Sequence, residues 1–339
     1  NLPDEFWESR PSLRHIRQAA HSRTRSADAV LTAVLARISV QIPPEITLPP
    51  IVGGKASLNL LIGIIATSGG GKSTSNDVAK DLVPIDRMDV VADVPPGSGE
   101  GITELFFEMV PEENHEGKMR KVKRQTKRGA LIYLDEGQAL AEMGNRKGAT
   151  LLPTLRSAWS GAVIGQSNAT VETHRVLKAH TYRLSIIIGF QLEYAAPLIA
   201  DAAGGTPQRF VFASAIDPNL PDTPPDWPGE IGIDIPALTP DGTTIEFDDD
   251  IRNEIWQTAR AITKGEHTPD PLDSHADLVK MKVAAILAVL EGRWNVDTDD
   301  WALAGHIMRT STAVRSWVVS QARATEQRRE DAFARKLAN

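Results

Sequence analysis

Residues 66–74 read Ala66-Thr67-Ser68-Gly69-Gly70-Gly71-Lys72-Ser73-Thr74, and this stretch decides the fold. It follows an apolar run, Leu58 to Ile65, that predicts a buried strand, and it precedes a segment, Thr74 to Leu82, that predicts a helix. A strand, a glycine-rich loop ending in Gly-Lys-Ser and a helix are typical of a phosphate-binding loop. Small residues let backbone N–H groups surround a polyphosphate at the positive end of the helix. We therefore expect residues 67–74 to contact phosphates.

Two side chains of this stretch have specific expected roles. Lys72 is expected to pair with the β- and γ-phosphates, and the Ser73 hydroxyl is expected to ligate magnesium. Ala66 stands where the usual pattern begins with glycine, which alanine can replace because that position closes the strand and needs no positive φ. A glycine-rich turn with a lysine there by chance is the alternative, and a second motif argues against it.

The second motif is an acidic pair behind another apolar run. Ala130 to Leu134 predicts a strand buried on both faces of a parallel sheet, and Asp135-Glu136-Gly137-Gln138 follows it. Carboxylates after such a strand lie where open α/β sheets bind ligands. We expect Asp135 to hold the magnesium shell and Glu136 to polarise the attacking water.

Two further strands carry candidate catalytic side chains. Arg183 to Phe190 predicts a buried strand ending in Gln191, whose side chain is expected to sense the γ-phosphate. Arg209 lies two residues before the apolar run Val211 to Ala215 and is a candidate arginine finger, donated to the nucleotide of a neighbouring subunit. A surface salt bridge is the alternative role for Arg209.

Basic residues gather in two segments outside these strands. A helix is expected over Thr103 to Met109, and the alternation of Met119 to Arg128 favours a hairpin arm. Val163 to Ala179 predicts a second hairpin or a helical insertion, with two basic residues near its tip. A plain solvated loop is the alternative to DNA binding by these segments. The residues expected to contact DNA phosphates are Arg120, Lys121, Lys123, Arg124, Lys127, Arg128, Arg175 and Lys178.

Composition limits the class of protein. The chain has 339 residues, 41% hydrophobic and 24% charged, which fits a soluble globular protein. Its net charge of −7 excludes a globally basic nucleic-acid binder, although ten acidic residues fall in 217–250 alone. Cysteine is absent, which excludes disulfides and thiolate metal sites and suits a cytoplasmic location. No apolar run reaches about 18 residues, so no membrane association is expected.

These patterns divide the chain into three expected parts. Residues 1–50 are expected to form a helical collar and linker, with helices from Pro11 and over Asp28 to Ile42. The arginines of this part are assigned to a solvated helix face rather than to DNA. Residues 51–250 are expected to form an α/β ATPase core with inserted hairpins and an extended acidic segment or mobile linker over 217–250. Residues 251–339 are expected to form a helical lid.

Four segments of the chain occur together in one known family. The loop at 68–73, Leu-Asp-Glu-Gly at 134–137, Thr-Leu-Leu-Pro-Thr-Leu-Arg-Ser-Ala-Trp-Ser-Gly at 150–161 and Gly-Gly-Thr-Pro-Gln-Arg-Phe at 204–210 carry the resemblance. The chain resembles the P-loop ATPase/helicase domain linked to primases in actinobacterial phages, plasmids and integrated elements. More distantly, it is similar to AAA+ domains of minichromosome-maintenance-type helicases. Gln191 stands where that family usually has asparagine, and the lid has no clear sensor arginine, with Lys282 as a candidate in its place.

The resemblance implies an α/β P-loop NTPase fold of the AAA+/RecA-like kind. It also implies ATP and Mg²⁺ at the subunit interfaces of a homo-hexameric ring, hairpin arms facing a DNA channel, and a primase or other replication proteins as partners. The function expected is an ATP-driven DNA motor, a replicative helicase or replication-initiation ATPase. Two alternatives are an ATP-dependent loader acting on a protein partner and a nucleotide-binding regulatory subunit that hydrolyses nothing.

Overall fold

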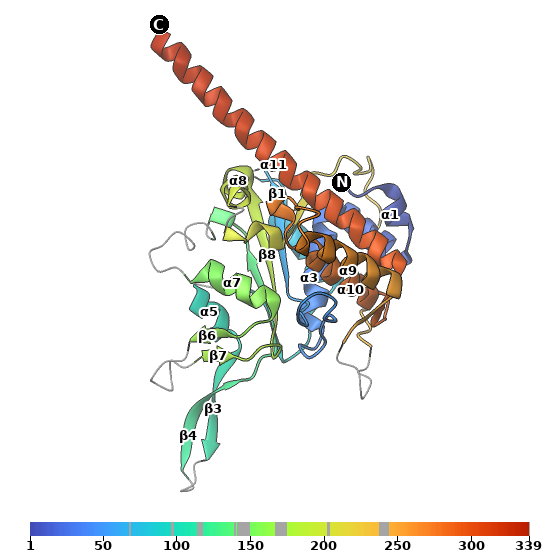
Figure 1. Ribbon diagram of the computed structural model, residues 1–339, viewed down its shortest axis with the longest axis vertical. Helices are drawn as coiled ribbons and strands as arrows, with labels where there is room; N and C mark the ends of the chain where they lie inside the picture. The colour runs from blue at the N-terminus through green and yellow to red at the C-terminus, as the bar shows by residue number, and fades with distance from the viewer. Residues whose placement is uncertain are drawn as a thin grey trace.

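A five-stranded parallel sheet forms the centre of the chain (Figure 1). The structure is a computed structural model that describes residues 1–67, 69–95, 98–113, 118–138, 140, 150–166, 175–201, 204–236 and 244–338. The strands lie in the order β2 (Val90–Val94), β5 (Gly129–Leu134), β8 (Arg183–Gln191), β1 (Leu60–Ala66) and β9 (Phe210–Ser214). All neighbouring pairs are parallel, so the expected α/β class is confirmed.

Helices cover this sheet because its middle strands are apolar throughout. Every residue of β1 is buried, as are the first eight of β8. Helix α3 (Ala27–Gln41) packs on β5, β8, β1 and β9, and all its residues except the last are buried. Helices α2 (Pro11–Ser22) and α4 (Lys72–Leu82) pack in turn on α3, and α1 (Asp4–Glu8) packs on α2. The N-terminal helices therefore share one hydrophobic core with the sheet.

The C-terminal helices extend the same core. Helix α10 (Ala276–Leu290) packs on α3, and α11 (Thr298–Ala338) packs on α10, on β9 and on α8 (Leu192–Ala200). Helix α9 (Asp249–Thr263) contacts α11, and the short strands β10 (Glu246–Phe247) and β11 (Asn295–Val296) pair beside them. Helix α11 runs through the charged C-terminal tail and projects beyond the other elements (Figure 1). Among the residues described, no helix is long and apolar enough to cross a bilayer.

Two hairpins leave the sheet between its strands. Strands β3 (Phe107–Glu113) and β4 (Met119–Gln125) form an antiparallel arm that extends away from the body, which confirms the hairpin expected for the basic segment (Figure 1). Strands β6 (Ile164–Gln166) and β7 (Arg175–Leu177) form the second hairpin, so of the two expected alternatives the hairpin is formed rather than the helical insertion. Arg175 begins β7, but Lys178 follows it at the base of the hairpin, so the expectation that Lys178 lies near the tip is wrong.

One expected helix is not formed. Helix α5 covers only Gly99–Glu104, and the chain is extended again from Phe107, where a helix to Met109 was expected. The reason is pairing: Phe107 and Met109 lie opposite Gln125 and Lys123 of the other strand. Cross-strand contacts of this kind outweigh a short helical pattern.

Residues 217–236 of the acidic segment lie extended on the surface, as expected, whereas the end of the segment forms β10 and the start of α9. Residues 217–236 contain no helix or strand, and Ile231 N–H donates to the Leu82 carbonyl at the end of α4 (2.9 Å). Side chains of α2 hold its middle, since Gln18 Nε2 donates to the Asp226 carbonyl at 3.0 Å. Trp227 and Ile231 pack partly buried against the core. This segment therefore covers the outer side of α2 and α4.

One buried arginine joins the connector after α3 to the sheet. Arg183, the first residue of β8, is fully buried, and burial lowers its pKa to about 9. Its guanidinium donates to the carbonyls of Ile42 (3.3 Å), Pro43 (2.8 Å) and Ile46 (2.7 Å) and to Ser57 Oγ (2.6 Å). It donates to four acceptors of this connector, of which the Pro43 carbonyl also accepts from the Ile46 N–H and Ser57 Oγ from the Asn59 N–H.

Arg183→Met is expected to lower the free energy of unfolding by about 3 kcal/mol or more, because it removes four hydrogen bonds donated by one buried charged group. Arg14→Met is the matched control, since Arg14 is half exposed and pairs only with Glu8 and its carbonyl. It should cost less than about 0.5 kcal/mol. Urea denaturation followed by circular dichroism measures both. Equal stability of the two variants would contradict this structural role.

Candidate functional site

At the glycine-rich loop the chain turns tightly after β1, since the Gly70 N–H donates to the Thr67 carbonyl at 3.0 Å. Gly69 (φ 74°) and Gly71 (φ 83°) have left-handed backbone conformations that favour glycine. Gly70 is crowded instead: a Cβ there would lie 2.9 Å from Ala66 Cβ and 2.9 Å from the Thr67 carbonyl oxygen. Each of the three glycines is therefore needed by the local geometry. Ser68, also expected to contact phosphates, lies outside the described residues.

Helix α4 begins directly after this loop. The Gly71 carbonyl accepts hydrogen bonds from Thr74 Oγ1 (3.0 Å) and from Ser75 Oγ (2.9 Å). Thr74 and Ser75 thus use their hydroxyls inside the helix. The side chains of Lys72 and Ser73 make no hydrogen bond or ion pair with the part of the chain that is described. An amine and a hydroxyl therefore remain for a ligand at the positive end of α4.

The acidic pair, Asp135 and Glu136, follows β5 at the same edge of the sheet. Both residues are exposed. Tyr133 donates its phenolic hydrogen to Asp135 Oδ1 at 2.8 Å, and burial together with this carboxylate raises the pKa of Tyr133. The hydrogen bond fixes one oxygen of Asp135. Glu136 has no ion pair within the described ranges.

The loop and the acidic pair meet over β8. Gly189 lies in β8, the strand between β1 and β5, and its register partner is Ile64 of β1. A Cβ on Gly189 would lie 2.7 Å from the Asp135 carbonyl oxygen and 3.1 Å from both Cδ and Cε of Lys72. The side chain of Lys72 and the backbone of Asp135 therefore both lie close to the same point over Gly189. Any larger residue at position 189 would separate them.

Gln191 also lies at this edge. Its Cα is the register partner of Ala66, where β1 gives way to the glycine-rich loop. The residue is half-buried, and its side chain does not cap α8, which begins immediately after it. The expected proximity of Gln191 to the loop is confirmed, while its sensor role stays a prediction.

The oxygen donors here fit magnesium. No group of three or more His, Asp or Glu gathers anywhere among the described residues. Mg²⁺ is commonly held by one or two protein oxygens together with waters and substrate phosphates, rather than by an all-protein cage. The Asp135 carboxylate and the Ser73 hydroxyl supply such a set at the edge where a triphosphate would lie.

Comparison with models of protein families and with curated proteins finds no match. The interpretation of this edge therefore rests on its own geometry. Three segments that lie far apart in sequence supply the glycine-rich loop, the acidic pair and Gly189, and the parallel sheet brings them together. Loops at the carboxyl ends of parallel strands are where open α/β sheets bind ligands.

Arg209 lies at the opposite edge of the sheet. It ends the short 3₁₀ helix Pro207–Arg209 and precedes β9, whose other end pairs with β1 beside the glycine-rich loop. Its Nη1 donates to the Gly205 carbonyl, and its guanidinium lies 5.3 Å from the Trp159 ring centroid. Burial and the charge of Arg156 lower the pKa of Arg209. Arg209 has no ion pair among the described residues, so the surface salt bridge is not formed there.

Lys282 does not face the glycine-rich loop, so its candidacy as a sensor is wrong. The residue is fully buried on α10, and its Nζ donates to the carbonyls of Asn59 (2.8 Å) and Trp159 (2.5 Å). Asn59 precedes β1, at the edge opposite the loop. Burial lowers the pKa of Lys282 well below its usual range. Lys282 ties α10 to β1 and to α7 (Leu151–Ser160), which is a structural role.

The basic residues of the hairpins are largely paired. Strand β4 carries the cations, but β3 opposite it carries glutamates, so the arm has a mixed surface charge. A sequence window over β4 alone overstates how basic the arm is. Lys121 and Lys178 are exposed and form no ion pair with the described residues. Ion pairs with glutamate are formed by Arg120 and Arg124 (Glu112), Lys123 and Arg175 (Glu104), Lys127 (Glu108) and Arg128 (Glu45).

One cation near the glycine-rich loop was missed by the sequence analysis. Arg25, in the turn between α2 and α3, lies against Gly71: a Cβ on that glycine would be 3.2 Å from Arg25 Nη1. The N-terminal arginines were assigned together to a solvated helix face. Sequence carries no signal for this contact, because it depends on how α2 and α3 pack beside β1.

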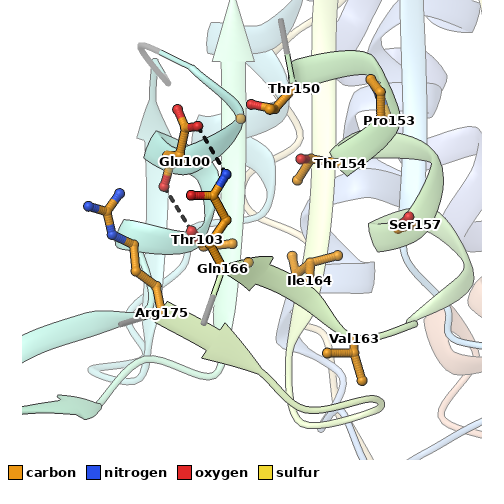
Figure 2. Close-up of a pocket in the computed structure, with 12 residues that line it drawn as sticks. Glu100, Thr103, Thr150, Pro153, Thr154, Ser157, Val163, Ile164, Gln166 and Arg175 are labelled. Atoms are coloured by element: carbon orange, nitrogen blue, oxygen red, sulfur yellow. Dashed lines mark hydrogen bonds between the residues drawn. The ribbon is translucent and has the colours of Figure 1, made fainter. Parts of the chain in front are cut away.

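A separate cavity of about 280 Å³ opens between α5, α7 and the β6–β7 hairpin. Hydroxyl groups of α7 face Glu100, Gln166 and Arg175 across it, and Gln166 Nε2 donates to Glu100 Oε1 at 3.4 Å (Figure 2). None of its lining residues belongs to the glycine-rich loop or to the acidic pair. The cavity is thus distinct from the Lys72 edge of the sheet.

Proposed function

We propose that this chain is a magnesium-dependent ATP hydrolase with a P-loop site at the carboxyl edge of β1, β8 and β5. The observation that carries the proposal is the approach of Lys72 and Asp135 to one point over Gly189. In a P-loop site the phosphate-binding lysine and the metal-binding carboxylate act on the same phosphates, so the two residues have to lie at one edge of the sheet. The two unengaged side chains at the start of α4, Lys72 and Ser73, support the same assignment.

Each residue of the edge then has a role. The backbone N–H groups of the loop and Lys72 hold the β- and γ-phosphates, while Ser73 and Asp135 hold the metal. A bound Mg²⁺ supplies charge neutralisation at the β- and γ-phosphate oxygens. Glu136 accepts a proton from the attacking water, and Gln191, next to the loop, orients groups around the γ-phosphate.

Arg209 acts on a neighbouring subunit in this proposal. It lies at the edge of its own sheet opposite the nucleotide edge. The length of β9, five residues at the usual rise of a strand, separates these two edges by roughly 15 Å. A head-to-tail contact between copies would place this edge of one subunit against the nucleotide edge of the next, and such contacts close into rings. This supports a ring, with a hexamer as the expected size.

The work that hydrolysis drives is proposed to be movement along DNA. Two hairpins project from the nucleotide domain, and exposed Lys121 and Lys178 are suited to phosphate contacts that do not depend on sequence. The glutamates of β3 favour a second candidate, an ATP-dependent loader whose arm binds a protein partner. The two candidates differ in how they respond to DNA.

The deciding experiment is the ATPase rate with Mg²⁺, with and without single-stranded DNA, across a salt series, together with the mass of the assembly. The motor is expected to be stimulated by DNA at low salt and progressively less at higher salt. Lys121→Ala with Lys178→Ala should weaken the stimulation, whereas Lys264→Ala, an exposed lysine at the end of α9, should not.

Three outcomes separate the proposals. Hydrolysis that ignores DNA and both hairpin lysines would favour the loader. Binding of ATP without any turnover would favour a regulatory subunit. A protein that binds no nucleotide would overturn the P-loop assignment itself.

A further inference from the structure

We infer that Arg25 binds the α- and β-phosphates of the nucleotide held by its own subunit, as a second cation beside Lys72. The inference rests on the proposed function, because it adds a residue to that nucleotide site. It assigns an active role to the N-terminal helices, which the sequence analysis treated as a collar with solvated arginines.

The contact between Arg25 and the loop is close. Nη1, Cδ and Cζ of Arg25 would lie 3.2, 3.3 and 3.4 Å from a Cβ built on Gly71, so the side chain lies across this glycine. Nη1 donates to the Thr24 carbonyl at 2.8 Å. Arg25 has no ion pair among the residues that are described, and a guanidinium has five donors. Donors therefore remain for a phosphate.

The turn that presents Arg25 is held in place by its own backbone. Thr24 has a left-handed conformation (φ 57°), which is uncommon for a residue other than glycine. The N–H of Arg25 donates back to the Ala20 carbonyl of α2 at 2.9 Å, and the N–H of Thr24 donates to the His21 carbonyl at 3.0 Å. A backbone bent in this way directs the side chain at position 25 away from α2.

Contacts with the end of β9 fix the turn further. Ser26 Oγ donates to the carbonyl of Ser214, the last residue of β9, at 2.7 Å. Asp217 lies 3.1 Å from His21 Nε2 and accepts from the N–H of Ala27 at 3.1 Å, and both ring and carboxylate are almost buried. The Ala215 N–H donates to Ile65 of β1, next to the loop. Arg25 is therefore positioned before any ligand arrives, which reduces the entropy lost on binding.

The side of approach decides which phosphates Arg25 reaches. Lys72 and Asp135 lie over β8, on one side of β1, where the γ-phosphate and the metal belong. The Arg25 turn is attached to β9, on the other side of β1. A polyphosphate held along the loop therefore presents its α,β end to Arg25. The planar fork of a guanidinium matches two phosphate oxygens better than an ammonium does.

Arg23, in the same turn, is a matched control. It lies 3.7 Å from Asp81 and 4.8 Å from the Trp227 ring centroid, on the outer side of α4. Its replacement tests whether any loss of charge in the turn affects the site. Arg25→Lys keeps the charge but loses the fork, and Arg25→Gln keeps a polar side chain without charge.

The experiment measures dissociation constants of Mg-ATP and Mg-ADP by calorimetry, together with kcat and KM, for wild type, Arg25→Ala, Arg25→Gln, Arg25→Lys and Arg23→Ala. Arg25→Ala and Arg25→Gln are expected to weaken ATP and ADP alike by roughly tenfold to a hundredfold, the usual effect of losing a charge-assisted hydrogen bond. KM should rise accordingly while kcat changes less than a few-fold. Arg25→Lys should recover part of the affinity, and Arg23→Ala should bind like wild type.

Each other outcome overturns the inference in a recognisable way. Unchanged affinities in Arg25→Gln would show that Arg25 touches no phosphate, with the proposed function intact. A loss for ATP but not for ADP would place Arg25 at the γ-phosphate instead. An equal loss in Arg23→Ala would indicate a structural role of the turn. If wild type binds neither nucleotide, the proposed function fails, and the role of Arg25 fails with it.

Discussion

Lys72→Ala is expected to abolish ATP turnover, with a fall in rate of at least about a hundredfold, because it removes the cation aimed at the transferred phosphate. Lys72 lies at the start of α4 and over Gly189, and no described side chain neutralises it. The ammonium of Lys72 is therefore available to stabilise the negative charge that develops on the transferred phosphate. The free energy of unfolding should change little, since no hydrogen bond or ion pair with the described residues is lost.

Lys80→Ala is the control for this variant. Lys80 is on the same helix, more than half exposed, and lies 3.8 Å from Asp93, well away from the loop. Its replacement should leave turnover near the wild-type rate. Radioactive phosphate release under saturating Mg-ATP measures both variants, and calorimetry reports ATP binding. Retained turnover in Lys72→Ala would mean that the phosphate loop has been misplaced.

The fold was predictable because the strands of a buried parallel sheet are continuous apolar runs. β1, β5, β8 and β9 begin and end within two residues of the runs read from the sequence. Such runs need no knowledge of their partners, since both faces of the sheet are covered. The order of the strands was not predictable, because it depends on which helix covers which face.

The misassigned elements share a different cause. Phe107 and Met109 are extended because they pair with β4. The charge of Arg124 is offset because this residue forms an ion pair with Glu112. Lys282 is buried because Asn59 and Trp159 lie against it. Each depends on a neighbour that is distant in sequence. A local pattern cannot report such neighbours.

The residues of the site also differ in whether the sequence predicts their position. That the lysine of the loop and the acidic pair would meet followed from one general rule, that parallel strands end at a common edge. Two participants have weaker signals. Gly189 interrupts an apolar strand, which is a sign of close approach by another group. Arg25 has no signal at all, because its contact with Gly71 is made by the packing of α2 and α3.

Glu136→Gln is expected to bind ATP normally and to hydrolyse it about a hundredfold to ten-thousandfold more slowly, the usual effect of removing a general base. The substitution is nearly isosteric, and Glu136 is exposed without an ion pair among the residues described, so folding should be unaffected. Arg209→Ala should also lose turnover. Its defect, however, belongs to the site of the adjacent subunit in the proposed ring.

Mixing these two inactive variants tests that arrangement. In an equal mixture that assembles at random, about a quarter of the interfaces would combine an intact Glu136 with an intact Arg209 from the neighbour, as expected for head-to-tail contacts. Up to about a quarter of the wild-type rate should then return. A mixture of Glu136→Gln with Lys72→Ala is the control, because both changes affect the same subunit's site and no interface is repaired. Native mass spectrometry establishes that the mixed assemblies form; if they do and activity does not return, Arg209 does not act on a neighbouring subunit.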